Sequence, residues 1–250
     1  MASNLRIHIA PVGFDSVERI TNPLTEQKAD RVYIVSRSKQ DPASEIVSKV
    51  EKVLAKHPSI EVKHVYADIW DLFSCLEKYR SIFSLEKDNH VYVNVSTGSK
   101  ILSMAGMLAC MLWGGSPYYA RLDYEDGGPL KGTDKRKVMG FDFLPVYQIN
   151  MPSSESLQVL AFLEKAGGKM SKKELIEELQ SPKVKMIPVY QPSQPKSAPH
   201  SRLRAILDPL ELHWHFVEIK SRGRRSDVLL TEQGRNALRI FGKGQHIDRS

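Results

Sequence analysis

The sequence predicts an α/β fold, a mostly parallel sheet with helices on both faces, followed by a smaller C-terminal domain. Short apolar runs alternate with segments of helical spacing through the first 150 residues, as in sheets whose parallel strands are joined by helices. The charge then changes. Residues 1–150 carry 19 Lys and Arg against 18 Asp and Glu, whereas residues 151–250 carry 17 against 11. We therefore expect two domains, 1–150 and 151–250, with different partners.

The N-terminal elements justify a Rossmann-like sheet. The predicted strands are 5–10, 31–36, 60–66, 91–95, 118–123 and 138–149. The predicted helices are 14–28, 45–57, 69–85 and 101–113. Residues 123–137 are rich in glycine and charge and are expected to form a hairpin loop. In sheets of this kind, ligands bind outside the carboxyl ends of the strands.

The C-terminal hundred residues predict a cluster of helices with one hairpin. The predicted helices are 156–167, 172–180, 201–207 and 231–240. Ser171 is placed to cap the second helix, with Glu174 three residues on, and Thr231 is placed to cap the last. The predicted wing strands are 214–220 and 227–230, on either side of a basic tip at 221–226. The stretch 181–199 holds five prolines and is predicted to be a long loop.

Length and composition exclude several classes of protein. No apolar run reaches the ~18 residues of a transmembrane helix, and Met1–Arg6 shows no secretory signal. We therefore expect a cytoplasmic protein without a membrane partner. The two cysteines, Cys75 and Cys110, lie in helix-like segments and are expected to be structural thiols rather than a disulfide.

The most informative motif is the turn between the fourth strand and the fourth helix. Such a turn leaves backbone N–H groups unpaired at the helix start, and hydroxyls and a lysine surround them here, so it is a natural phosphate cradle. The candidate ligand-binding residues of this turn are Asn94, Ser96, Thr97, Gly98, Ser99 and Lys100. The spacing is neither that of a Walker A loop nor Gly-x-Gly-x-x-Gly. An ordinary helix cap is the alternative interpretation.

A second turn follows the first strand and is expected to lie close to the cradle. Its candidate ligand-binding residues are Pro11, Val12, Gly13, Phe14 and Asp15. Phe14 or Pro11 would pack on a base, although a plain core position suits Phe14 equally well.

Together, Ile7–Phe14 and Asn94–Lys100 resemble the CARF (CRISPR-associated Rossmann fold) domain. The C-terminal part, with Leu230-Thr-Glu-x-Gly234 after the wing, resembles a winged helix-turn-helix domain, from which the proline-rich stretch departs. The resemblance implies a CARF–HTH transcriptional regulator of the archaeal type. It also implies a homodimer with one composite pocket for a cyclic oligoadenylate, above all the tetra-adenylate, a signal made by type III CRISPR complexes.

Two other functions stay open on this evidence. Some CARF domains cleave their own ligand without a metal, and Ser96, Thr97 and Lys100 would be the catalytic residues of such a ring nuclease. Neither turn, 11–15 or 94–100, contains a histidine to act as base, so we expect binding without turnover and no cofactor or metal. The other open function is a regulator of a different phosphate-containing ligand.

His213 and His215, beside Trp214, have no third metal ligand nearby and are expected to be surface or core residues.

The basic C-terminal part predicts binding to double-stranded DNA. The candidate DNA-binding residues are His200, Arg202, Arg204, Lys220, Arg222, Arg224 and Arg225. Arg202 and Arg204 lie on the predicted recognition helix, and the arginines of the wing tip suit phosphate or minor-groove contacts. A solvated basic hairpin is the alternative.

Overall fold

A computed structural model describes residues 4–40, 42–122, 138–187, 198–222 and 225–242. The chain divides into two compact units, Met1–Asn150 and Met151–Ser250. Each unit has its own core of buried apolar side chains. None of the helices within these ranges has the length and hydropathy that crossing a membrane requires.

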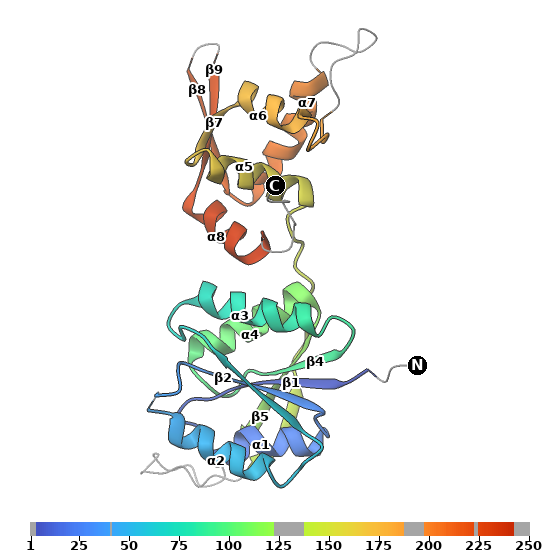
Figure 1. Ribbon diagram of the computed structural model, residues 1–250, viewed down its shortest axis with the longest axis vertical. Coiled ribbons are helices and arrows are strands. Elements are labelled where there is room, and N and C mark those ends of the chain that lie inside the picture. The colour runs from blue at the N-terminus through green and yellow to red at the C-terminus, as the bar shows by residue number, and fades with distance from the viewer. Residues whose placement is uncertain (1–3, 41, 123–137, 188–197, 223–224, 243–250) are drawn as a thin grey trace. The chain divides into compact units, whose positions relative to one another are not determined.

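The first unit is built on a six-stranded sheet (Figure 1). Its strands are β1 Arg6–Pro11, β2 Arg31–Ser36, β3 Glu61–Tyr66, β4 His90–Asn94, β5 Ser116–Leu122 and β6 Val138–Phe143. They lie in the order β3-β2-β1-β4-β5-β6. The first five are parallel and β6 is antiparallel to β5, so the predicted Rossmann-like, mostly parallel sheet is confirmed.

Helices cover both faces of this sheet, as Figure 1 shows. They are α1 Val17–Glu26, α2 Ser44–Leu54, α3 Leu72–Leu85 and α4 Lys100–Trp113. The pair α1 and α2 lies on one face and the pair α3 and α4 on the other. Because both faces are covered, β1 and β2 are buried over nearly their whole length.

The last strand is shorter than expected. β6 ends at Phe143, and residues 144–149 follow as irregular chain. The Leu144 N–H donates to the Pro117 carbonyl at 2.9 Å, and the Ile149 N–H donates to the Met111 carbonyl at 3.1 Å. The segment therefore bonds to β5 at its start and to α4 at its end. The expected hairpin loop 123–137 lies outside the described residues.

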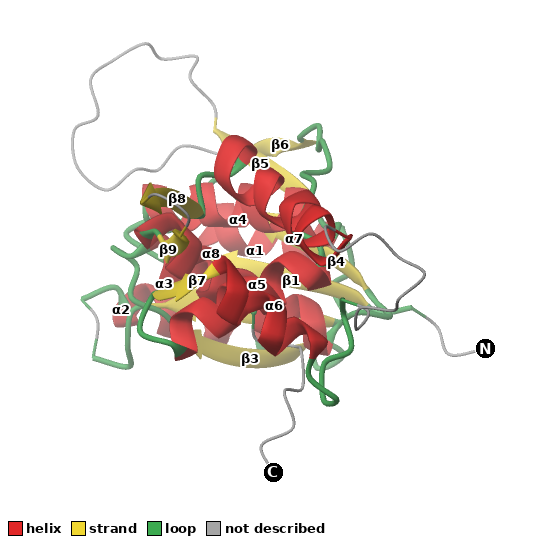
Figure 2. Cartoon of the chain, turned by 90° about the horizontal axis from the view of Figure 1, so that it is seen from above, coloured by secondary structure: helices red, strands yellow, loops and turns green. Residues whose placement is uncertain are grey.

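The second unit combines helices with a small antiparallel sheet. Its elements are α5 Ser154–Lys165, β7 Lys169–Ser171, α6 Lys172–Gln180, α7 Ala198–Asp208, the π-helical turn η1 Pro209–His213, β8 Val217–Arg222, β9 Arg225–Leu230 and α8 Glu232–Phe241. The strand order is β7-β9-β8, and β8 and β9 lie side by side in Figure 2. Three helices packed against such a hairpin form the winged helix arrangement, as expected.

Helix caps fix several of these boundaries. The Glu174 N–H donates to Ser171 Oγ at 3.2 Å and the Ser171 N–H donates to the Glu174 carboxylate at 2.7 Å, which is the expected capping box. Thr231 Oγ1 accepts from the Gly234 N–H at 3.1 Å. α7 begins at Ala198, three residues before the predicted start. Its first turn takes Pro199 because no intrahelical N–H bond is needed there.

Candidate ligand-binding site and nucleic-acid interface

The candidate ligand site lies where the chain direction divides in the sheet. β1 and β4 are neighbours, and their register pairs His8 with Tyr92. From β1 the chain continues into α1 on one face, whereas from β4 it continues into α4 on the other. The turns 12–16 and 95–99 therefore leave adjacent strand ends in opposite directions, which is where ligands bind in sheets of this type.

The two turns are in direct contact. Gly98 has φ +80°, and a Cβ atom at Gly98 would lie 2.6 Å from Pro11 Cβ. A Cβ atom at Gly13 would lie 3.2 Å from Gly98 Cα. Thr97 Oγ1 also donates to the Pro11 carbonyl at 2.7 Å. The closeness of the two motifs thus depends on glycine at both places, because any side chain would push the turns apart.

The hydroxyl groups of the cradle point into the protein. Thr97 is 1 % exposed. Ser96 Oγ donates to Asn94 Oδ1 at 2.5 Å and accepts from the Ala120 N–H at 3.2 Å. Ser99 Oγ caps α4 by accepting from the Leu102 N–H at 3.1 Å, and it donates to the Ile69 carbonyl at 3.0 Å. Thr97 is buried and Ser96 and Ser99 are half-buried, and the hydrogen bonds of all three hydroxyls hold the turn. Phosphate binding by these hydroxyls stays a prediction.

Other candidates from the motifs are also internal. Val12 is 2 % exposed and belongs to the core beneath α1, and Asn94 is fully buried. Asn94 Nδ2 donates to the Arg19 carbonyl at 3.2 Å, and its Oδ1 accepts from the Ser96 N–H at 2.9 Å. Both side chains position the two turns rather than presenting themselves at the surface.

Asp15, in the turn after β1, places a carboxylate on the turn after β4. Asp15 Oδ2 accepts from the Gly98 N–H at 2.7 Å. Burial raises the pKa of Asp15, while hydrogen bonds from Gly98 and Gly13 and the charge of Arg19 act against that rise. One amide of the cradle therefore already binds a carboxylate of the protein itself.

Two motif side chains remain directed to solvent. Phe14 is 81 % exposed, and Lys100 is exposed at the first position of α4. The ammonium group of Lys100 and the helix N-terminus add positive charge at the same place. A ligand that has an anionic group for Lys100 and a planar ring for Phe14 matches this combination.

Histidine and cysteine chemistry is remote from these turns. His8 is fully buried in β1, stacks on Tyr92 with ring centroids 4.8 Å apart, and has its pKa lowered to about 4 by burial. Cys75 and Cys110 are buried and form no disulfide, and burial raises their pKa values to about 11 and about 12. Within the described ranges, no group of three or more His, Cys, Asp or Glu is arranged to hold a metal.

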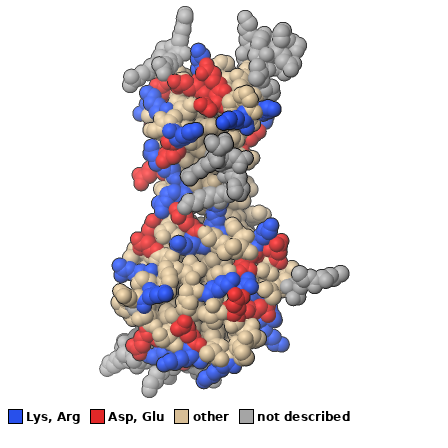
Figure 3. Space-filling view, viewed as in Figure 1, with Lys and Arg blue, Asp and Glu red and all other residues tan. Residues whose placement is uncertain are grey.

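The predicted DNA-binding residues lie on α7 and the hairpin. Arg202 forms an ion pair with Glu155 at 3.0 Å, and Arg204 pairs with Asp208 at 3.3 Å. His200 is exposed on the same helix. Exposed ion pairs of this kind are weak, so the arginines can exchange them for phosphates. On the visible face of this unit, basic and acidic side chains are interspersed (Figure 3).

The hairpin carries the remaining predicted residues. Lys220 on β8 lies 3.3 Å from Glu218. Arg222 and Arg225 form the last pair in the register of β8 and β9. Their side chains, and Arg224 altogether, lie outside the described residues.

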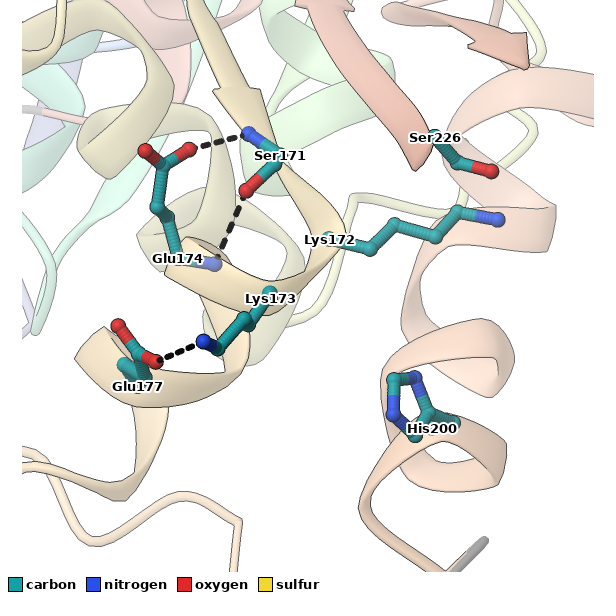
Figure 4. A pocket seen from close by; sticks show the side chains of 7 residues that line it. All are labelled: Ser171, Lys172, Lys173, Glu174, Glu177, His200 and Ser226. Carbon is teal, nitrogen blue, oxygen red and sulfur yellow. Dashed lines mark hydrogen bonds and ion pairs between the residues drawn. The ribbon is translucent and has the colours of Figure 1, made fainter. Parts of the chain in front are cut away.

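A groove beside α7 adds two lysines that the sequence analysis missed. The groove holds about 630 Å³ and lies between the start of α6, α7 and β9. Its lining residues are Ser171, Lys172, Lys173, Glu174, Glu177, His200 and Ser226 (Figure 4). Lys172 extends between Ser226 and His200, and Lys173 lies 3.8 Å from Glu177. The signal in the sequence was a lysine pair directly after a helix cap.

Two family models match the chain, one in each unit. Residues 6–124 match the family described as HFX_2341_N-like, N-terminal. Residues 155–242 match the family described as DUF6293 C-terminal winged helix domain. The C-terminal unit is a winged helix domain. It follows the Rossmann-like sheet in the chain, so the expected combination of a Rossmann-like domain with a winged helix domain is confirmed.

The chain is similar to a curated protein over part of its length. The uncharacterized protein MJ1513 of Methanocaldococcus jannaschii is 27 % identical over 197 residues, which are 65 % of this chain and 57 % of that protein. The match therefore spans less than two thirds of the relative.

Three solved structures are similar to the chain. Can2 from Sulfobacillus thermosulfidooxidans, in complex with cyclic tetra-adenylate, has 13 % identity and a TM-score of 0.40 over 95 % of this chain and 64 % of its own. Csm6 from Enterococcus italicus, bound to cyclic hexa-2′-fluoro-hexa-dAMP, has 11 % identity and a TM-score of 0.43, covering 86 % and 57 %. Protein VC1899 from Vibrio cholerae has 11 % identity and a TM-score of 0.40, covering 90 % and 77 %.

Proposed function

We propose that this protein is a DNA-binding transcriptional regulator that responds to a cyclic oligoadenylate, above all cyclic tetra-adenylate, in type III CRISPR defence. The observation that carries the proposal is the contact between the turns after β1 and β4, with Lys100 and Phe14 exposed beside it, in a chain that also contains a winged helix domain. The class of ligand follows from the resemblance of these two turns to the CARF motifs.

The ligand step uses charge and shape. Lys100 and the start of α4 attract a phosphate, and Phe14 offers a ring surface to an adenine. Ser96, Thr97 and Ser99 support the site as positioning residues. A ring of repeated nucleotides has two-fold character, and a homodimer presents each turn twice around its axis.

Exposed apolar side chains on and after α4 support a homodimer. Met104 of α4 is 57 % exposed, and Tyr147 in the segment 144–149 is 75 % exposed. Ile149, 39 % exposed, is joined to α4 through its N–H bond to Met111. Methionine and aromatic side chains are enriched at protein interfaces.

The DNA step uses α7 as the recognition helix. His200, Arg202 and Arg204 would reach base edges and phosphates from α7. Lys172 and Lys173 at the start of α6, with Lys220 on β8, would bind the phosphate backbone. The ring would then change the affinity for DNA by favouring one placement of the two winged helix domains in the dimer.

Calorimetric titration with cyclic oligoadenylates of each ring size tests the ligand step. We expect one ring to bind in the micromolar range or tighter, and Lys100→Ala to abolish that binding while basal DNA affinity is kept. Lys87→Ala is the matched control, because Lys87 is exposed between α3 and β4, at the amino end of β4, whereas the candidate site lies at its carboxyl end. If no ring binds, or if Lys87→Ala does the same damage, the proposal fails.

The same samples separate binding from turnover. Labelled cyclic tetra-adenylate incubated with the protein in EDTA should stay cyclic. A linear product would identify a metal-independent ring nuclease instead.

A further inference from the structure

A second exposed aromatic side chain lies next to the turn 95–99. The loop 67–71 joins β3 to α3 and leaves the sheet at the same carboxyl edge as the turns after β1 and β4. The bond from Ser99 Oγ to the Ile69 carbonyl, 3.0 Å long, fastens this loop to the start of α4. The next residue is Trp70, which is 69 % exposed.

The loop around Trp70 is fixed by its own hydrogen bonds. The Trp70 N–H donates to Asp68 Oδ1 and the Asp71 N–H donates to the Asp68 carbonyl, both at 3.1 Å. The Asp68 N–H donates to Ser74 Oγ at 3.2 Å, and Cys75 Sγ donates to the Asp68 carbonyl at 3.3 Å. The indole itself makes no ring or cation contact with any residue that the structure describes. A fixed backbone thus presents an uncovered indole, which lowers the entropy cost of receiving a planar partner.

We propose that Trp70 is a stacking platform for an adenine base of the ligand whose phosphate lies at Lys100 and the start of α4. This inference rests on the proposed function and adds to it a residue that recognises the base. Phe14 follows Gly13, which touches Gly98, and Trp70 follows Ile69, which is bonded to Ser99. The turn 95–99 therefore contacts two loops, and each of these loops carries an exposed aromatic ring one residue beyond the contact. A phosphate at the turn with bases on neighbouring rings is the layout of an oligonucleotide.

Local charge favours a base over a phosphate at Trp70. Asp68 and Asp71 flank the tryptophan, and their carboxylates repel a phosphate. Adenine is uncharged, so only its stacking surface is involved. The phosphate is drawn instead to Lys100.

Calorimetry with cyclic tetra-adenylate on the full chain tests the role of Trp70. We expect Trp70→Ala to weaken binding by roughly 5- to 100-fold, and Trp70→Phe to stay within a few-fold of wild type because phenylalanine still stacks. Leu85→Ala is the matched control, since Leu85 is 75 % exposed at the far end of α3. Ring binding that is unchanged in Trp70→Ala overturns the inference and leaves the proposed function standing.

A second measurement does not depend on the ring. The difference in fluorescence between wild type and Trp70→Phe reports Trp70 alone. Millimolar AMP should quench it and ribose 5-phosphate should not. No response to AMP overturns the stacking role. Quenching by AMP, with no ring binding tighter than AMP, supports Trp70 and refutes the cyclic ligand.

Sedimentation velocity separates a base platform from a subunit contact. Trp70→Ala should self-associate as wild type does. If the variant loses self-association while nucleotide affinity stays unchanged, Trp70 contacts a second copy of the chain and the inference fails.

Discussion

At the scale of single residues, Gly98 determines how closely the two turns of the candidate ligand site approach each other. Its φ of +80° and its approach to Pro11 bring the two turns together, and its N–H binds Asp15. Residues with a side chain rarely adopt such a φ, and a Cβ atom at this position would also collide with Pro11.

Gly98→Ala should therefore open the site. A Cβ atom would lie 2.6 Å from Pro11 Cβ, so we expect a loss of about 2–4 kcal/mol in the free energy of unfolding and loss of ring binding. Gly114→Ala is the control: its φ is +84°, but a Cβ there meets nothing within 4 Å. Urea unfolding of both variants isolates the steric part, and equal losses would show that Gly98 matters only for backbone freedom.

His8 predicts a pH dependence of stability. Its pKa is lowered from 6.5 to about 4, mainly by burial, so folding disfavours the charged imidazole. The stability held by neutral His8 is present above pH 6.5 and is lost as the pH falls through about 4. The loss approaches about 1.4 kcal/mol per pH unit, or about 3 kcal/mol in total.

Urea unfolding of wild type and His8→Phe across this range checks the prediction. Carboxylates titrate in both proteins, so the difference between the two curves reports His8. The variant should lose less stability on acidification, and parallel curves would contradict the burial argument.

The sequence predicted which residues meet at the site but not which way they face. The order of strands and turns placed Gly13 and Gly98 at one edge. The direction of the Ser96, Thr97 and Ser99 hydroxyls was beyond it, because serine and threonine bond to local backbone as readily as to a ligand. Trp70 was missed because the predicted helix 69–85 placed it in a first helical turn, whereas α3 begins at Leu72 and leaves Trp70 in the loop before it.

At the scale of elements, caps were predictable and short irregular pieces were not. Ser171 and Thr231 mark their helices by local chemistry. β7 was missed because its three residues pair with β9, far along the chain. η1 was missed because it is a single π-helical turn, in which the Trp214 N–H donates to the Pro209 carbonyl at 3.1 Å, and such turns have no periodic signal.

The start of α6 gives a test of the DNA interface. We expect Lys172→Ala to weaken DNA binding and to reduce the slope of log affinity against log salt by about one, the value for one lost phosphate contact. Lys183→Ala is the control, because Lys183 is exposed just after the other end of α6. Fluorescence anisotropy at several salt concentrations measures both, and identical slopes would remove α6 from the interface.

The wing calls for a separate variant. Replacing Arg222, Arg224 and Arg225 together by alanine should flatten the salt dependence further. If the slope stays that of wild type, the wing tip does not contact DNA.

At the scale of the whole molecule, alternation of strands and helices predicted the class of sheet. It did not predict the spatial order, since β3-β2-β1-β4-β5-β6 requires that the chain return from the β3 edge to a place beside β1. The antiparallel β6 pairs with β5 and ends at Phe143, and after one more bond to β5 the chain reaches α4 at Ile149. The excess charge of the last hundred residues was read from composition alone.

The two sheltered cysteines have a practical consequence. Thiols with pKa values near 11 and 12 carry almost no thiolate at neutral pH, and neither sulfur is open to reagents. Maleimide dyes or spin labels should therefore react only with cysteines introduced on the surface. One label in each unit of the otherwise native chain would let spectroscopy test whether the distance between the two labels changes when a cyclic oligoadenylate is added.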